Sequence, residues 1–329
     1  MWILYAFNDN NGDYVYYYYD YLKIGRGDFY SFSFNEEGYI LFAYFCSRYL
    51  HFTYQHFVIL TSAISTLMLG FVVVRLSAQP NVVLALFMLN PYWMMICQTR
   101  FYMAFLCVLV GYVFLIKYEG LKGIVLFLMW VAASGFVHRT GWLCLILVFA
   151  RIKNRKIVGW LMTIIALAII SFRSPIGLRI ALRFLPVKKA NDWLTVEAHR
   201  SLTGVVILIL IRVLLLVAAV YIYRRLKEKG CSSNRDFYLV VGIILMMSFL
   251  PMEWIDKNFE RFFRFSLMFV YFLYGDFREA YPVRFKSMPF GHVIVAGAVL
   301  VYYAFFAVSF SGWFEHNLVP IMENNLLLP

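Results

Sequence analysis

Long apolar segments alternate with short polar ones along most of the chain. They cover roughly 38–50, 56–75, 82–97, 101–117, 123–137, 141–150, 157–172, 202–223, 237–250, 262–275 and 290–312. A helix that crosses a bilayer needs about 20 mostly apolar residues, and several of these segments approach that length. The pattern therefore predicts an all-α, polytopic integral membrane protein with roughly 9–11 transmembrane or half-spanning helices.

The composition agrees with this fold class. Of the 329 residues 63% are hydrophobic and only 15% are charged, and the mean hydropathy is +0.72. Soluble domains are about 45–50% apolar and about 25% charged. These values exclude an ordinary soluble enzyme and a disordered chain. Because the apolar segments leave little room for a globular domain, we expect residues 1–329 to form a single polytopic membrane domain.

Two stretches depart from simple alternation. Residues 1–36 form a polar, Tyr-rich N-terminal segment, in which Asn, Gly and Asp mark a loop and the tyrosines suit the membrane–water boundary. The segments on either side of His138 are short for full spans. Short elements are tolerated at membrane depth where protein or water surrounds them. We therefore expect a re-entrant-like hairpin around His138.

The formal net charge of +12 bears on orientation. Short loops rich in Lys and Arg are expected in the cytoplasm. Three loops fit this description, and they are RIKNRK at 151–156, YRRLKEKG at 223–230 together with Arg235, and the loop 278–286. If successive spans cross the membrane in opposite directions, starting from these cytoplasmic loops, then Arg100, His138 and the loop 173–201 lie on the outer side.

The outer loop 173–201 is basic, with six Lys and Arg residues against two acidic ones. Its sequence SPIGLRIALRFLP predicts a short amphipathic helix at the membrane surface, on which Arg179 and Arg183 are four residues apart and share a face. These arginines either contact anionic lipid headgroups or form a basic vestibule for an anionic ligand such as a diphosphate.

Arg100 stands near the outer end of an apolar segment, in the sequence CQTRFYMAF. Ionisable residues near membrane depth are costly and usually face the interior of a helix bundle. The planar guanidinium suits phosphate because it donates two parallel hydrogen bonds. The alternative is an arginine that only anchors the helix end at the interface. Asn90 and Pro91 interrupt the preceding segment, and we expect them to kink or break that helix.

His138 and Arg139 occupy a polar turn between two short apolar segments. A neutral histidine can take a proton from a sugar hydroxyl, and a charged one can contact phosphate. A headgroup contact or a packing role remains open for His138. Arg139 beside it is a candidate for substrate binding.

Charged residues recur at helical spacing in the stretch PMEWIDKNFERFFRF, 251–265. One interpretation is an outer helix held by charge pairs three and four residues apart. The other places Arg261 or Arg264 in the same cavity as Arg100, where they bind substrate.

Two acidic residues, Asp13 and Glu37, bracket the tyrosine-rich stretch. Either carboxylate can bind sugar hydroxyls or act as a base. Aromatic rings beside carboxylates are typical of sugar binding, because ring faces stack on the C–H surfaces of sugars. The tyrosines alternatively serve as interfacial anchors.

Several familiar chemical motifs are absent from the sequence. It contains no P-loop, no HExxH, no GxSxG, no Cys-x-x-Cys pair and no acidic pattern typical of a metal site. We therefore expect a metal-independent reaction without a cofactor, driven by substrate positioning and by contacts from Arg and His.

An ordered set of short motifs in the first half of the chain resembles the EpsG family of polysaccharide polymerases, which are related in role to Wzy-type O-antigen polymerases. These motifs are GDYVYYYYDY at 12–21, EEGYILF at 36–42, QTRFYMAF at 98–105 and GFVHRTG at 135–141. The resemblance is clearest over roughly residues 5–155. Phe101 stands where the family has Gln, and Gln98 nearby is a candidate for substrate binding instead. Arg139 and Thr140 replace Lys and Ser conservatively.

The resemblance implies an enzyme of the bacterial cytoplasmic membrane that joins lipid-diphosphate-linked oligosaccharide repeat units on the outer side. A glycosidic bond forms, and a polyprenyl diphosphate leaves. Arginines such as Arg100 stabilise the departing diphosphate, and His138, Asp13 or Glu37 removes the proton of the acceptor hydroxyl. The implied partners are the bilayer, the lipid-linked substrate, a flippase and a chain-length regulator. Nucleic acid is not expected, despite the basic charge.

Other functions remain open at the level of sequence. A glycosyltransferase or ligase with a lipid-linked donor belongs to the same chemical class, but such enzymes often carry a large outer domain. A polysaccharide flippase or other transporter usually shows matching halves and midplane charges, whereas the charges here cluster at the outer helix ends. A membrane acyltransferase can also use a residue such as His138.

Overall fold

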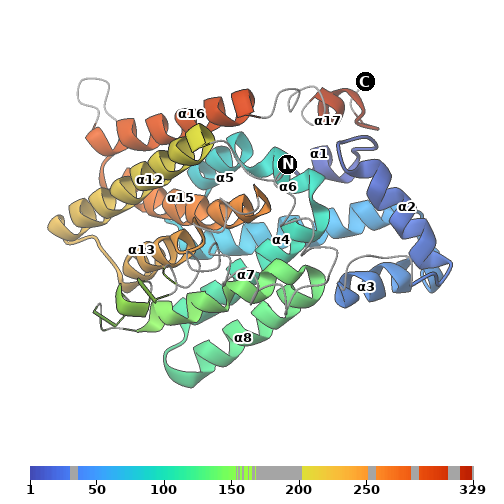
Figure 1. The fold of residues 1–329 in the computed structure, drawn as a ribbon, viewed down its shortest axis with the longest axis horizontal. Helices are drawn as coiled ribbons and strands as arrows, with labels where there is room; N and C mark the ends of the chain where they lie inside the picture. Colours follow the sequence, from blue (N-terminus) through green and yellow to red (C-terminus); the bar gives the residue numbers. More distant parts are fainter. Residues whose placement is uncertain are drawn as a thin grey trace. The chain divides into compact units, whose positions relative to one another are not determined.

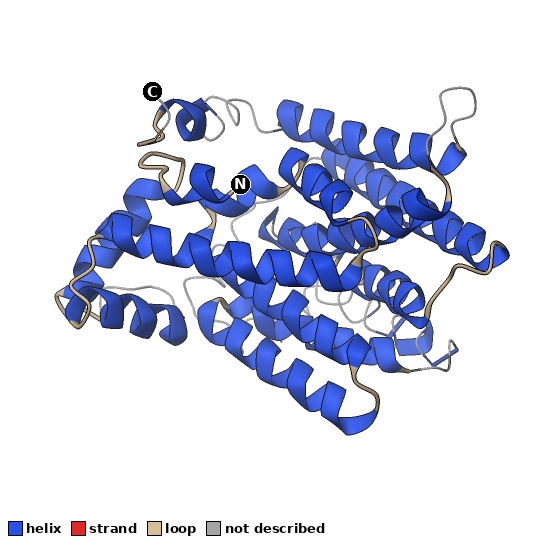
Figure 2. Cartoon of the chain, turned by 180° about the vertical axis from the view of Figure 1, so that it is seen from behind, coloured by secondary structure: helices blue, strands red, loops and turns tan. Residues whose placement is uncertain are grey.

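A computed structural model describes the protein at residues 1–29, 36–152, 154, 156–157, 159–161, 163–164, 167, 202–250, 257–282, 289–309 and 319–327. Within these ranges the chain forms helices joined by turns and loops, and no strand is found (Figure 2). The prediction of an all-α protein is therefore confirmed. The predicted amphipathic helix with Arg179 and Arg183 lies outside the described residues.

The chain divides into two compact units, one formed by Met1–Val148 with Phe306–Pro329 and the other by Phe149–Phe305. Unit 1 contains α1 (Trp2–Ala6), α2 (Tyr14–Gly25), α3 (Glu37–Arg48), α4 (Tyr54–Leu76), α5 (Pro80–Leu89), α6 (Tyr92–Cys97), α7 (Thr99–Lys117), α8 (Gly120–Val137) and α17 (Val319–Glu323). Unit 2 contains α12 (Leu202–Glu228), α13 (Asn234–Met247), the 3-10 helix η3 (Lys257–Phe262), α15 (Phe263–Ala280) and α16 (Phe290–Ser309). The 3-10 helix η1 (Arg139–Arg151) contains the boundary. The organisation of 1–329 as one membrane domain stays a prediction.

Three of the described helices, α4, α7 and α8, are long and apolar enough to cross a membrane. Helix α8 exposes many of its apolar side chains, among them Leu121 and Met129, as a lipid-facing helix would. The expected total of roughly 9–11 spanning or half-spanning helices stays a prediction.

The apolar segment 82–97 is broken where its sequence predicts a break. Helix α5 ends at Leu89 and α6 begins at Tyr92, with Asn90 and Pro91 between them. Proline has no N–H to donate and its ring clashes with the preceding turn, so a continuous helix is disfavoured there.

The tyrosine-rich segment differs from the prediction, because residues 14–25 form a helix and not a loop. Tyr17, Tyr21 and Ile24 recur at helical spacing and are buried. Tyr21 packs on Tyr54 and Phe57 of α4, at centroid distances of 5.6 and 5.0 Å. This burial against α4 outweighs the weak helix propensity of tyrosine, a tertiary contact that local turn signals do not reveal.

Helices α7 and α8 form a tightly packed antiparallel pair joined by Tyr118 and Glu119. The Ser134 hydroxyl donates to the carbonyl of Ala104 at 2.8 Å, which links the two helices. Since α7 rises about 1.5 Å per residue, its ends lie roughly 27 Å apart. Arg100 therefore lies at the same end of the pair as His138, with the Tyr118 turn at the opposite end.

The two ends of the chain meet inside unit 1. Asn8 and Asn325 form an isolated antiparallel bridge, and the Asn325 side chain donates to the carbonyl of Ile3 at 3.2 Å. Figure 1 shows α17 beside α1 for this reason. This contact holds the C-terminal helix α17 against α1.

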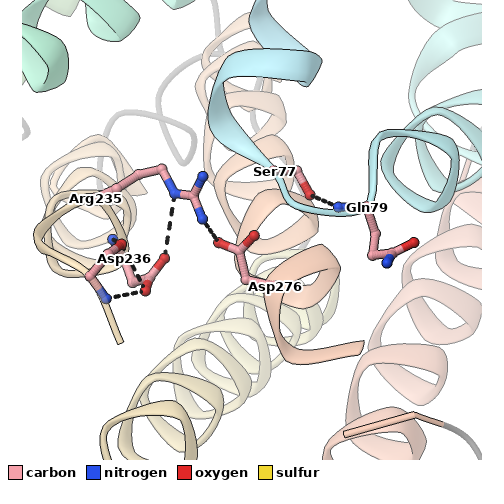
Figure 3. Close-up of polar contacts among 6 residues, drawn as sticks. Ser77, Gln79, Arg235, Asp236 and Asp276 are labelled. Carbon is pink, nitrogen blue, oxygen red and sulfur yellow. Dashed lines mark hydrogen bonds and ion pairs between the residues drawn. The ribbon is translucent and has the colours of Figure 1, made fainter. Parts of the chain in front are cut away.

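In unit 2, the basic loops converge at one end. Arg235, at the start of α13, forms ion pairs with Asp236 and with Asp276 near the end of α15 (Figure 3). The Tyr281 hydroxyl donates to the carbonyl of Arg225 at 3.1 Å, and this bond connects the residue after α15 to the last turn of α12. Side chains from two predicted cytoplasmic clusters thus share one end of the unit, as the orientation rule expects.

Candidate functional site

Three polar side chains from separate parts of unit 1 meet at one point. Arg100 Nη1 lies 2.9 Å from Glu36 Oε2, and His138 Nε2 lies 3.5 Å from Glu36 Oε1. Glu36 precedes α3, Arg100 lies in the first turn of α7, and His138 follows the last residue of α8. One carboxylate thus connects an arginine and a histidine that are distant in sequence.

A close approach of two helices brings Glu36 to His138. Gly38 in the first turn of α3 lies against Phe136 near the end of α8, so that an added Cβ would stand 2.9 Å from Phe136 Cβ and 3.1 Å from its backbone. Only glycine fits this spacing without displacement. The packing of Gly38 against Phe136 therefore fixes the distance between the ends of α3 and α8.

Two tyrosine rings hold the guanidinium of Arg100. Its Cζ lies 5.0 Å from the ring centroid of Tyr17 on α2 and 5.8 Å from that of Tyr39 on α3. Cation–π contacts of this kind stabilise by about 0.5–2 kcal/mol, more when water is excluded. The buried face of the tyrosine-rich helix α2 is therefore part of the site.

The His138 ring is oriented by Thr140. The Thr140 backbone N–H donates to His138 Nδ1 at 3.3 Å, and the Thr140 hydroxyl lies 2.7 Å from the same nitrogen. A backbone N–H can only donate, so Nδ1 is the acceptor and the neutral ring carries its proton on Nε2, toward Glu36. Phe101 packs edge-on against the ring at 5.7 Å. The ring is thus fixed from two sides.

The site is largely removed from water. The side chain of Glu36 is 7% exposed, that of His138 14% and that of Arg100 20%. A charge buried this far needs a partner, and the ion pair supplies one. Nearby, burial raises the pKa of Asp20 on α2 above its usual value, an effect that Arg100 opposes. Among the described residues, no group of three His, Cys, Asp or Glu side chains suitable for a metal ion is found.

Two of the predicted catalytic residues, Arg100 and His138, lie in this cluster. The predicted carboxylate Glu37 is the first residue of α3 and is exposed. The carboxylate that contacts Arg100 and His138 belongs to its neighbour, Glu36, which was not among the predicted site residues.

Three other candidates lie close in the chain to the cluster. Asp13 precedes α2, and its carbonyl accepts from Tyr17 N–H at 3.1 Å, one turn before the ring that stacks on Arg100. Gln98 lies directly before α7 and is partly exposed. Arg139 follows His138 and is exposed. Their roles in catalysis and substrate binding stay predictions.

The remaining candidates belong to unit 2. Arg264 is 2% exposed in the first turn of α15, and Arg261 is partly exposed in η3. Their predicted place in a common cavity with Arg100 stays a prediction.

A periodic signal in the sequence could have identified Glu36. The buried residues of α3 are Tyr39, Ala43 and Cys46, and Glu36 continues this stripe three residues before Tyr39. Glu37 is one position off the stripe, about 100° around the helix. The spacing therefore distinguishes the inward carboxylate from the outward one.

Comparison with known proteins agrees with the motifs at this site. The family model described as EpsG family matches residues 1–320. No curated protein matches the chain, and no solved structure does. The matched range contains Glu36, Arg100 and His138 as well as the whole of unit 2. The chain therefore belongs to the EpsG family, and its role is that of a polysaccharide polymerase in a membrane.

Proposed function

We propose that the protein polymerises oligosaccharide repeat units carried on a polyprenyl diphosphate, at the outer side of the bacterial cytoplasmic membrane. The observation that carries this proposal is the Glu36–Arg100–His138 cluster, built from three motifs of a polysaccharide polymerase family. Glycosyl transfer from a diphosphate needs a base for the acceptor hydroxyl and a cation for the leaving diphosphate. The carboxylate, guanidinium and imidazole of this water-poor site can fill these roles.

In the proposed reaction, a hydroxyl of the acceptor unit attacks the anomeric carbon of the donor unit. A glycosidic C–O bond forms while the C–O bond to the diphosphate breaks. The electron pair of the broken bond stays on the diphosphate oxygen, and the hydroxyl proton moves to the Glu36 carboxylate. No redox step is involved, and the side chains alone supply the charge and the base.

Arg100 binds the departing diphosphate in this scheme. The guanidinium is presented by the first turn of α7 and is held between Tyr17 and Tyr39, so little freedom is lost when the substrate binds. Preorganised donors aimed at developing charge are a large source of catalysis. A diphosphate that shares Arg100 with Glu36 also draws positive charge away from the carboxylate, which makes Glu36 a stronger base.

His138 positions Glu36 in this scheme. Its Nε2–H faces Glu36 Oε1, while Thr140 holds Nδ1. An oriented imidazole of this kind fixes a carboxylate and can share its proton after transfer. The neighbouring candidates Asp13, Gln98 and Arg139 are proposed to contact sugar or phosphate groups around this centre. A flippase that delivers the units and a regulator of chain length are the proposed partners.

Polymer length in cells that carry Arg100→Ala or His138→Ala tests the proposal. We expect each variant to remain in the membrane and to lose long polymer on gels. Arg75→Ala, in α4, is a control because this arginine stacks on Phe71 of its own helix. Normal long chains in both site variants would overturn the assignment of the site.

The side of the membrane on which substrate accumulates distinguishes the polymerase from a flippase. If the protein polymerises delivered units, deletion leaves single lipid-linked units on the outer side. Units trapped on the inner side would favour a transporter.

A further inference from the structure

Asp20 on α2 is a carboxylate that the proposed reaction does not use. It is partly exposed, and it follows Tyr17, whose ring stacks on Arg100, by three residues. Residues three apart on a helix are neighbours on one face. Asp20 therefore lies on the side of α2 that faces Arg100, next to the candidate site.

The packing of α2 on α4 shows which edge of that face carries Asp20. Tyr54 is the first residue of α4, and α2 lies across this end of α4 (Figure 1). The Tyr54 ring contacts three tyrosine rings of α2, those of Tyr14, Tyr18 and Tyr21. At 3.6 residues per turn, these rings lie about 40–100° from Tyr17 around the helix in one direction, and Asp20 lies about 60° from it in the other. Asp20 is therefore on the edge away from Tyr54, beside Arg100 and within reach of water.

The charge of Asp20 costs the folded protein stability. No ion pair or hydrogen bond to its carboxylate is found among the residues that the structure describes. Burial raises the pKa of Asp20 above its usual value, and Arg100 and Lys23 only oppose this rise. An asparagine at this position would avoid the cost of the buried charge. A charged group that the fold does not need is typical of a functional site, where stability is exchanged for activity.

We propose that Asp20 binds hydroxyl groups of the sugar that carries the leaving diphosphate. This inference rests on the proposed function, in which Arg100 binds that diphosphate. The sugar is bonded directly to the diphosphate, so it lies next to Arg100 when the substrate is bound. A carboxylate beside Arg100 is then within reach of its hydroxyl groups.

Hydroxyl groups suit this position better than a second anion does. An ionised carboxylate only accepts hydrogen bonds, and its bonds to donors are stronger than those between neutral groups. A second phosphate beside Asp20 would be repelled by the carboxylate, whereas a neutral hydroxyl is not. The bound sugar also replaces the water that Asp20 has lost, so the cost of its charge is smaller in the complex than in the empty site.

The dependence of the polymerisation rate on substrate concentration tests the proposal. The assay uses the purified full chain in vesicles, with lipid-linked repeat units extracted from cells that lack the protein. Asp20→Ala should raise the half-saturating concentration about ten- to hundredfold, because a hydrogen bond to a charged group is lost. Asp20→Asn should raise it less, since the amide oxygen still accepts. Asp28→Asn is the matched control, because Asp28 is exposed just after α2, and it should bind substrate as the wild-type protein does.

Thermal unfolding at pH 7 distinguishes a binding residue from a structural one. Loss of a structural residue lowers both stability and activity. Asp20→Asn and Asp20→Ala should instead unfold at or above the wild-type temperature while they bind substrate more weakly. If both variants are this stable and keep the wild-type half-saturating concentration, the proposal is overturned. Unfolding below the wild-type temperature would also overturn it, because Asp20 would then be structural.

The outcomes also separate this inference from the proposed function. Unchanged saturation in the Asp20 variants, with polymer lost in Arg100→Ala, would reject the sugar contact alone. Weaker saturation in the Asp20 variants, with normal long chains in Arg100→Ala and His138→Ala, would reject the catalytic assignment and keep Asp20 as a sugar contact.

Discussion

The sharpest consequence of the site is that Glu36 and Glu37, adjacent in sequence, differ in function. Glu36 lies 2.9 Å from Arg100, whereas Glu37 is exposed. At an effective dielectric constant of about 20, two unit charges at that distance attract by about 6 kcal/mol before desolvation is subtracted. Removing one partner of a buried ion pair costs about 3–5 kcal/mol. Because one fifth of the Arg100 side chain is exposed, we expect about 3 kcal/mol for Glu36→Gln.

The effect of Glu36→Gln on catalysis should be larger than its effect on stability. The amide keeps the shape of the side chain but cannot accept the acceptor hydroxyl's proton, and loss of a general base slows reactions about 10²–10⁴-fold. The assay is the rate of polymer formation from lipid-linked units in vesicles, divided by the amount of folded protein. Thermal unfolding in detergent reports the stability change separately.

Glu37→Gln is the matched control, one residue away and at the surface. Surface substitutions change free energies by about 0.5 kcal/mol or less, so its rate should stay within about twofold. Glu36→Asp keeps the charge and should recover part of the activity lost in Glu36→Gln. A folded Glu36→Gln protein that polymerises at the wild-type rate would refute the reasoning, and loss of activity in Glu37→Gln alone would return the role of base to Glu37.

Four further predictions follow from the geometry. Gly38→Ala should destabilise the protein by about 1–3 kcal/mol, because the new Cβ meets Phe136 at 2.9 Å. Gly70→Ala is the control and should stabilise α4, because the space around Gly70 is open. Thermal unfolding compares the two variants. Thr140→Val should slow polymerisation about fivefold because it removes the hydroxyl at His138 Nδ1, and Thr140→Ser should not. Burial raises the pKa of Asp20 above its usual 3.8, so ionised Asp20 lowers the stability of the folded protein at pH values above 3.8. Asp20→Asn should therefore raise the unfolding temperature at pH 7. The difference from the wild-type protein should vanish as the pH falls below 3.8. Finally, polymerisation should continue in EDTA, and a requirement for a divalent ion would contradict the proposed metal-free step.

Much of the fold could be predicted because its signals are local. The break between α5 and α6 follows from Pro91, whose missing N–H acts on its own turn. The shared position of Arg100 and His138 at one end follows from alternation of two apolar segments of similar length. The same local rules failed at the tyrosine-rich helix α2. Its stability comes from packing against α4, which is 30 or more residues away in the chain.

The site was harder to predict than the fold. Arg100 and His138 stand out because a charged or titratable residue is rare beside apolar segments. Glu36 does not stand out beside Glu37, and only the stripe through Tyr39 and Ala43 distinguishes them. Arg212 was open to recognition from sequence, since it interrupts a long apolar helix, but the ring it contacts, Phe263, comes from a segment about 50 residues away.

The class of the protein follows from its composition and motifs: an apolar chain with few charges places its helices in a membrane, and its ordered motifs resemble one family of polymerases. Which side chains act together depends on how the helices pack. Hydrophobic periodicity reports how each helix is buried, but a contact such as that of Gly38 with Phe136 depends on two helices meeting. The distance from Glu36 to Arg100 and His138 is set by that meeting, and no local pattern encodes it.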